Sequence, residues 1–210
     1  LVRNAQVTAE ASCRSKARLL ARGNVTAKAD VDLNSYKLLL LNADRAIAVV
    51  NPHVDFTITN MESVIPLPGE PFDWRMSGDG STVFVSLPSL DLAIGIDTLT
   101  LSPIRLINAG QGSRPAAVAA LAGDRAAVEL AGKGAVALVS AAADEPSPAV
   151  LVGPSPMVLA ADPSGGRLFA AAADGHLVSI DTVSLAITAD IALGAAPGAM
   201  LWLPALGRLA

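Results

Sequence analysis

Aromatic side chains are scarce in this 210-residue chain, at 3% of positions, and cysteine occurs only once. The single thiol of Cys13 excludes an intramolecular disulfide, and two histidines supply few ligands for a zinc site. The sequence also lacks the Gly-x-Ser-x-Gly, Gly-x-x-x-x-Gly-Lys-Ser/Thr, Gly-x-Gly-x-x-Gly and His-Glu-x-x-His motifs. These absences argue against the common hydrolases, nucleotide-binding enzymes and zinc proteases, and we expect neither a cofactor nor a metal.

Charged residues are also sparse, at 16%, whereas 52% of residues are hydrophobic and the mean hydropathy is +0.49. Such values are typical of membrane proteins, but no apolar run reaches the roughly 18 residues that a spanning helix needs. We therefore expect no transmembrane segment. The excess of Ala, Val and Leu instead predicts strands buried on both faces, with some apolar surface left for protein contacts.

Basic residues gather at the start of the chain. Residues 1–28 hold six basic residues and one acidic residue, whereas residues 29–210 hold nine basic and eighteen acidic residues. A targeting remnant, a contact for an anionic partner and a charge-protected strand edge would each explain this segment, and we favour an edge or interface. The acidic remainder has no basic, aromatic-rich face, so nucleic-acid binding is not expected.

Prolines mark a repeat along most of the chain. At intervals of 44, 41 and 41 residues, a proline precedes a short apolar run and a Gly/Asp turn, at Pro71, Pro115, Pro156 and Pro197. An Ile-Asp-Thr segment shares the period, at 96–98 and 180–182, as do turn residues at 77–80, 122–125 and 163–166. A period of about 40 to 50 residues indicates a β-propeller, in which each repeat forms one four-stranded blade.

The clearest unit predicts four strands, at Met157–Ala161, Arg167–Ala172, His176–Asp181 and Leu185–Leu193. Asp174-Gly175 is a strong hairpin signal, because both central residues of a type I′ turn need positive φ. The same pattern predicts strands at 36–41, 45–50, 54–59 and 63–67, at 72–76, 82–87, 91–97 and 104–108, and at 116–121, 126–131, 135–140 and 149–152.

The expected fold class is therefore all-β, a β-propeller of four-stranded antiparallel blades. The blades are expected at 36–69, 70–112, 113–154 and 155–196, with 197–210 beginning another and 1–35 forming a basic segment or a degenerate blade. Four to five blades suggest part of a larger propeller, or one that a partner completes, because an open stack leaves sheet faces and strand edges exposed.

Two units carry a family resemblance. The segments 76–85 (Met-Ser-Gly-Asp-Gly-Ser-Thr-Val-Phe-Val) and 162–170 (Asp-Pro-Ser-Gly-Gly-Arg-Leu-Phe-Ala), each followed by Ile-Asp-Thr, resemble the YVTN-type β-propeller repeat. The resemblance covers about residues 70–205, but the middle unit has Val-Ser-Ala at 139–141 in place of Ile-Asp-Thr. This repeat occurs in bacterial and archaeal envelope proteins and in subunits of periplasmic redox enzymes, which implies a periplasmic or extracellular location. It specifies a blade and no chemistry.

Four residues are candidates for a channel or interface site. Asp73 and Arg75 fall on a predicted inner strand where other units have Ala or Val, and a charged pair there is costly unless it is paired or faces a solvated channel. Trp74 and Trp202 lie three and five residues after their prolines, so both rings should face the same side of that strand. Packing between blades is the main interpretation, and a ligand platform is the alternative.

Other repeated polar residues have a structural interpretation. Asp97 and Asp181 are expected to accept backbone hydrogen bonds in the turn that follows each of them. His53 and His176 occupy comparable hairpin positions in different units and are expected to be ordinary turn residues, with a ligand or haem contact as the alternative.

Two function hypotheses remain. The first, which we favour, is a non-catalytic scaffold that binds a protein partner or further copies of itself through rim loops and unmatched blade edges. The second is the propeller portion of a redox or lactone-processing enzyme, with a site in the axial channel. Convergent His, Tyr, Arg or Glu side chains in the channel would support the enzyme, whereas an Ala/Val/Leu lining would support the scaffold.

Overall fold

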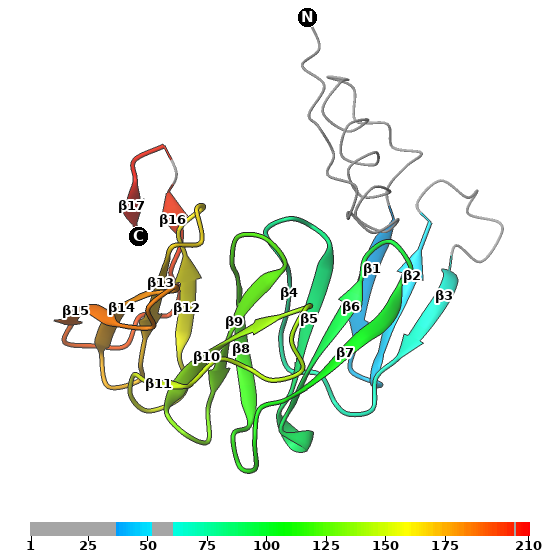
Figure 1. The fold of residues 1–210 in the computed structure, drawn as a ribbon, viewed down its shortest axis with the longest axis horizontal. Helices are drawn as coiled ribbons and strands as arrows, with labels where there is room; N and C mark the ends of the chain where they lie inside the picture. The colour runs from blue at the N-terminus through cyan, green and yellow to red at the C-terminus, as the bar shows by residue number, and fades with distance from the viewer. Residues whose placement is uncertain (1–36, 52–60, 204) are drawn as a thin grey trace, which may run out of the picture.

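The computed structural model describes residues 37–51, 61–203 and 205–210, which form an all-β structure (Figure 1). Three sheets have four antiparallel strands in chain order, one has three strands and one has two. In the described residues no α-helix occurs, and none of the helical structure could cross a membrane. The sheets follow one another across the molecule from β1–β3 to β16–β17, and in this part of the chain they do not close into a ring.

The elements follow the order of the chain. The first sheet holds β1 (Leu38–Asn42), β2 (Ala46–Val50) and β3 (Met61–Pro66), and the second holds β4 (Trp74–Met76), β5 (Thr82–Leu87), β6 (Leu92–Asp97) and β7 (Ser102–Asn108), with the short 3-10 helix η2 (Pro88–Leu90). The third holds β8 (Pro115–Ala120), β9 (Arg125–Leu130), β10 (Ala135–Ser140) and β11 (Val150–Leu151), and the fourth holds β12 (Val158–Ala161), β13 (Arg167–Ala171), β14 (His176–Asp181) and β15 (Ile187–Ala192). The pair β16 (Trp202–Leu203) and β17 (Arg208–Leu209) ends the series.

The strands predicted in the second, third and fourth sheets are all present, with ends shifted by a few residues. Their first strands lie side by side, because β8 contacts both β4 and β12. This arrangement makes the first strand of each sheet the inner one and leaves the fourth strand on the outside.

The first sheet corrects the prediction for residues 36–69. The segment 63–67 was expected as a fourth strand beside 54–59, but β3 pairs directly with β2, and 54–59 lies outside the described residues. A repeated backbone hydrogen bond shows which strands correspond. In the four-stranded sheets, the residue just before the third strand has a positive φ, and its carbonyl accepts the amide that follows the fourth strand, as at Asp91, Gly134 and Gly175. Arg45, just before β2, makes the same hydrogen bond with the amide that follows β3. Hence β1, β2 and β3 correspond to the second, third and fourth strands of the other sheets.

The core lies between sheets, and each central strand contributes to two of its layers. Phe84 packs with Val118 and Val128 toward the third sheet, whereas its neighbours Val83 and Val85 pack toward the first sheet. Because successive side chains of a strand point to opposite faces, β5 is buried along its whole length. The prediction of strands buried on both faces is therefore confirmed, and small alanine side chains such as Ala127 help to fill the layer between the third and fourth sheets.

The repeated turns lie against one another at one rim. The amide of Gly78 donates to the carbonyl of Leu121 at 2.8 Å, and a Cβ at Gly78 would approach that oxygen to 2.5 Å. A Cβ at Gly165, which has φ +67°, would approach the backbone nitrogen of Ala122 to 2.3 Å from the other side. Glycine recurs in these turns because backbones of neighbouring sheets meet there.

The Ile-Asp-Thr repeat joins two turns in the second sheet and in the fourth. The Asp97 carboxylate accepts the amides of Leu99 and Thr100, at 2.9 and 2.7 Å, and Asp181 does the same for Val183 and Ser184 at 3.0 and 2.7 Å. This confirms the turn-capping role predicted for both residues. The threonine that follows donates its hydroxyl to the carbonyl of Gly80 or Gly165, which ties the end of the third strand to the start of the second.

Candidate functional site

A groove of about 730 Å³ runs along the inner strands. Its walls are the first strands β4, β8 and β12 with the turns that follow them, and Met200, Leu201 and Trp202 close one side. Most of the lining is Ala, Val and Leu, as at Val118, Ala119 and Leu159. The charged residues in the lining are Arg75, Asp79 and Asp162.

The two carboxylates of the groove are engaged in their own turns. Asp79 accepts the hydroxyl of Ser77 at 2.7 Å and the amide of Ser81 at 3.0 Å. Asp162 accepts the hydroxyl of Ser164 at 2.7 Å and the amide of Arg167 at 3.0 Å. Partial burial opposes ionisation of Asp162, but these hydrogen bonds outweigh it, and the pKa of this carboxyl lies below its usual value. Both groups therefore stabilise turns.

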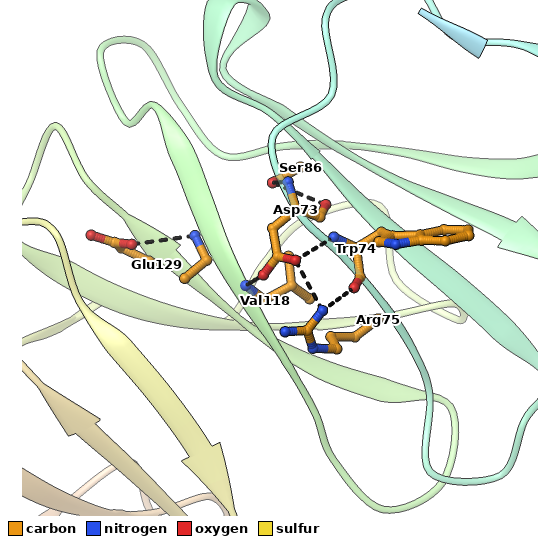
Figure 2. Close-up of polar contacts among 7 residues, drawn as sticks. Asp73, Trp74, Arg75, Ser86, Val118 and Glu129 are labelled. Carbon is orange, nitrogen blue, oxygen red and sulfur yellow. Dashed lines mark hydrogen bonds and ion pairs between the residues drawn. The ribbon is translucent and has the colours of Figure 1, made fainter. Parts of the chain in front are cut away.

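Asp73 connects the second sheet to the third (Figure 2). One carboxylate oxygen accepts the amide of Trp74 at 2.8 Å, and the other accepts the amide of Val118, on β8, at 2.9 Å. The backbone of Asp73 is held in turn by the buried hydroxyl of Ser86, which accepts its amide and donates to its carbonyl. The carboxylate thus lies between two sheets and accepts a backbone amide from each of them.

Arg75 belongs to the same group but lies at the surface. Its guanidinium donates to Asp73 at 3.0 Å and to the carbonyl of Trp74 at 2.8 Å, while 55% of its side chain remains exposed. An exposed ion pair of this kind contributes little to stability. The structure therefore brings Asp73, Trp74 and Arg75 together, with the arginine as the member that reaches the groove.

Glu129 makes the equivalent connection between the third and fourth sheets, and the sequence analysis did not identify it. This side chain of β9 is only 1% exposed, and its two oxygens accept the amides of Ala117 at 3.2 Å and Met157 at 3.0 Å. Met157 immediately precedes β12, the inner strand of the next sheet. The sequence signal that could have identified Glu129 is a single acidic residue in the mostly apolar strand Arg-Ala-Ala-Val-Glu-Leu. Such a residue stands out because a buried charge needs dedicated partners.

Substitutions of Asp73 and of Arg75 should change the free energy of unfolding by different amounts. Asp73→Ala leaves the amide of Val118 without its acceptor at a partly buried position, and we expect a loss of about 1–3 kcal/mol in the free energy of unfolding. Arg75→Ala removes only an exposed ion pair, so the expected change is below about 1 kcal/mol. Urea denaturation of both variants measures this difference. An equal or larger loss for Arg75→Ala would contradict the role assigned to Asp73.

Both tryptophans face the sheet that precedes them in the chain. Trp74 packs against the cluster formed by the first and second sheets, and it also lines a second groove of about 580 Å³ beside β1. Trp202 stacks on Phe169 of the fourth sheet with ring centroids 5.6 Å apart. Both rings therefore face the same side of their strands, as their positions relative to the prolines predict. Packing between sheets explains the placement of both rings.

His176 begins β14, as its position after Asp174-Gly175 predicts. Its Nδ1 lies 2.9 Å from Asp190 on the adjacent β15, and hydrogen bonding to this carboxylate raises the pKa of the exposed imidazole above its usual value. Its contacts are those of a residue at a hairpin. His53 and Cys13 lie outside the described residues.

Within the ranges that the structure describes, no group of three or more His, Cys, Asp or Glu residues could hold a metal ion. No protein-family model matches the sequence, and a comparison with curated proteins gives no match. Function therefore has to be argued from the geometry of the sheets and grooves.

Proposed function

We propose that this chain is a non-catalytic scaffold or protein-interaction module, built from β-propeller blades of the YVTN type, within a larger assembly. Repeated four-stranded sheets and inner strands that lie side by side support the propeller architecture. An inner groove lined mainly by Ala, Val and Leu favours the scaffold over the redox or lactone-processing enzyme, because Asp79 and Asp162 are held by turn hydrogen bonds.

The observation that carries the proposal is the exposed apolar surface on the first sheet and on the outer strand of the fourth sheet. On the first sheet, Leu40 and Val64 flank Ala48 in one cross-strand row, and they are 50% and 48% exposed. On the fourth sheet, every residue of the outer strand β15 is exposed, including Ile187 and Ile191. Contiguous apolar residues at unmatched sheet faces are typical of protein interfaces.

Association through the first sheet predicts a concentration-dependent increase in mass. Sedimentation velocity of the full chain should show self-association, or uptake of a purified partner once one is known. The double variant Leu40→Lys/Val64→Lys should remain monomeric, because it places charges in the apolar row. A dye that binds exposed apolar surface should bind this variant less than it binds the unmodified chain.

The matched control carries the same change on outer strands of the middle sheets. Leu106 on β7 and Leu151 on β11 are 57% and 73% exposed, so Leu106→Lys/Leu151→Lys also adds two charges. This control should associate like the unmodified chain. A chain that stays monomeric at every concentration, and binds no more dye than the Leu40/Val64 variant, would contradict the proposed interaction surface.

The periplasmic or extracellular location implied by the repeat belongs to the same proposal. Fractionation of the source cells, with an antibody against the chain, tests it directly. Recovery in the cytoplasmic fraction alone would contradict the location and leave the interaction surface to be judged by sedimentation.

A further inference from the structure

The outer strand β15 differs from the other outer strands of the described sheets. All six of its residues are exposed, and in the described part of the chain β14 is the one strand that pairs with it (Figure 1). A bulge lies at its start, and residues 189–192 pair regularly with β14. The backbone groups on the outer side of such a strand can pair with another chain.

The direction of these backbone groups follows from one hydrogen bond. The amide of Leu193 donates to the carbonyl of Gly175 at 2.8 Å, on the side of β14. Residues of an antiparallel strand alternate between the two sides, so Asp190 and Ala192 direct their N–H and C=O groups away from β14. Both residues therefore present a donor and an acceptor at the edge.

The other outer strands contain features that hinder such pairing. A proline lies in each of them or within two residues of it, at Pro66 in β3, Pro103 in β7 and Pro148 before β11. In β7, Arg105 also forms an ion pair with Asp144 of the neighbouring sheet's connection. Proline and charge are common means of protecting sheet edges. The sequence of β15, Ile-Thr-Ala-Asp-Ile-Ala, has no proline and one charged residue.

A groove of about 370 Å³ reaches the same edge. Ala189 and Ile191 of β15 line it together with Leu177 of β14, and Phe169 and Leu209 lie farther inside the sheet and on β17. Ile191 is 51% exposed. Alternate side chains of a strand added to β15 would lie on this face, because neighbouring residues of paired strands share a face of the sheet. The groove therefore suits apolar side chains of an added strand.

Asp190 indicates the charge of the partner. By alternation, its side chain lies on the face opposite Ala189 and Ile191. It contacts His176 at 2.9 Å, and 57% of the Asp190 side chain remains exposed. Opposite charges on paired strands attract, whereas like charges repel. A second copy of β15 would bring another aspartate and no basic residue, so a strand from a different protein with Lys or Arg at this position is complementary.

We infer that the outer edge of β15 is a β-addition site for an extended segment of a partner protein, in which apolar residues flank a lysine or arginine. The basic side chain lies opposite Asp190, and the apolar side chains lie over the groove beside Ile191. The segment forms a fifth strand, outside the four strands of the sheet. The inference rests on the interaction function proposed above and assigns one site and one partner chemistry to it.

The peptide acetyl-Ser-Val-Thr-Val-Lys-Val-Thr-Val-Ser-amide is a probe of this chemistry. It should bind the full chain, as measured by the anisotropy of a fluorescent label on the peptide. Binding should slow hydrogen exchange at the amides of Asp190 and Ala192, because these amides become donors to the added strand.

The variant Ala192→Pro removes one outward donor and leaves the hydrogen bonds between β14 and β15 in place. It should weaken binding of the peptide by at least about fivefold, as expected for one lost hydrogen bond. The matched control is Leu106→Pro on β7, where the amide of Leu106 points outward by the same alternation. This control should bind like the unmodified chain. Retained exchange protection of β9 and β13 verifies that both variants are folded.

Exchange of charges tests the role of Asp190. Asp190→Lys should weaken binding of the lysine peptide by about threefold, and it should strengthen binding of the same peptide with glutamate in place of lysine. The control Glu145→Lys reverses the charge of an exposed acid on another sheet's connection and should change neither affinity.

Three results would overturn the inference: no binding of the lysine peptide, equal binding by Ala192→Pro, or slowed exchange at strands other than β15. Self-association that persists in Leu40→Lys/Val64→Lys but is lost in Ala192→Pro would also overturn it, because a second copy would then occupy β15. The peptide measurements are independent of the sedimentation test. Failure at β15 therefore leaves the surface of the first sheet unaffected, and a monomeric chain leaves β15 to be judged by the peptide.

Discussion

Glu129→Ala is expected to lower the free energy of unfolding by about 2–5 kcal/mol, because it leaves the amides of Ala117 and Met157 without an acceptor in a site closed to water. Each unpaired buried amide costs about 1–3 kcal/mol. Glu129→Gln keeps a single acceptor oxygen, so about half of this loss is expected. Urea denaturation gives the free energies, and hydrogen exchange should show loss of protection at the amide of Met157.

A further variant separates hydrogen bonding from the cost of burying a charge. Glu129→Met has similar volume and removes the charge, but it still provides no oxygen for the two amides. If the amide bonds dominate, this variant is destabilised almost as much as Glu129→Ala. A neutral or stabilising effect would show that burial of the carboxylate dominates, as in some buried ion pairs, and would contradict the connecting role of Glu129. The exposed Glu145 provides the control, with an expected change for Glu145→Ala within about 0.5 kcal/mol.

Gly132→Ala is expected to destabilise the chain by about 3 kcal/mol, because a Cβ at this position would lie 1.9 Å from the carbonyl oxygen of Gly112. Gly112 belongs to the connection between β7 and β8, so relief of the clash displaces this connection from the turn between β9 and β10. The same shift weakens the 2.9 Å hydrogen bond from the amide of Gly132 to the carbonyl of Ser113. Thermal and urea unfolding measure the loss.

Gly198→Ala is the matched control for Gly132→Ala. No atom lies within 4 Å of a Cβ at Gly198, and neither glycine has a φ in the left-handed region. The control should therefore be neutral or stabilise by up to about 1 kcal/mol, because alanine restricts the unfolded chain. Similar losses for both variants would indicate a general cost of replacing glycine and would contradict the close contact between the two segments.

Local patterns were sufficient to find most strands and their turns. In β12–β15, the Asp-Gly turn, the apolar alternation and the Ile-Asp-Thr ending lie within about ten residues of the strands that they define. Asp97 and Asp181 could be assigned for the same reason, since each caps a turn two or three residues away. Such short-range hydrogen bonds depend on residue type and spacing, which the sequence contains directly.

The correspondence of the strands in the first sheet and the partners of the two connecting carboxylates could not be found in this way. Alternation is the same in a first or a second strand, so the correspondence of β1 emerged only from backbone contacts such as Leu67 to Arg45. Asp73 and Val118 are 45 residues apart, and Glu129 and Met157 are 28 apart. A sequence pattern identifies a charged residue in an apolar run, but the identity of its partner depends on how the sheets pack.

By itself, the sequence determined the all-β composition of the described units, the spacing of their strands and the caps of their turns, because these follow from alternation, glycine conformations and short-range hydrogen bonds. The tertiary structure alone decided which strand of the first sheet is which. It also decided that Asp73 and Glu129 join neighbouring sheets through backbone amides, and that apolar side chains remain exposed on the first sheet and on β15. The physical reason is burial: a carboxylate or a leucine has a different role at the surface and between two sheets, and only packing sets its surroundings.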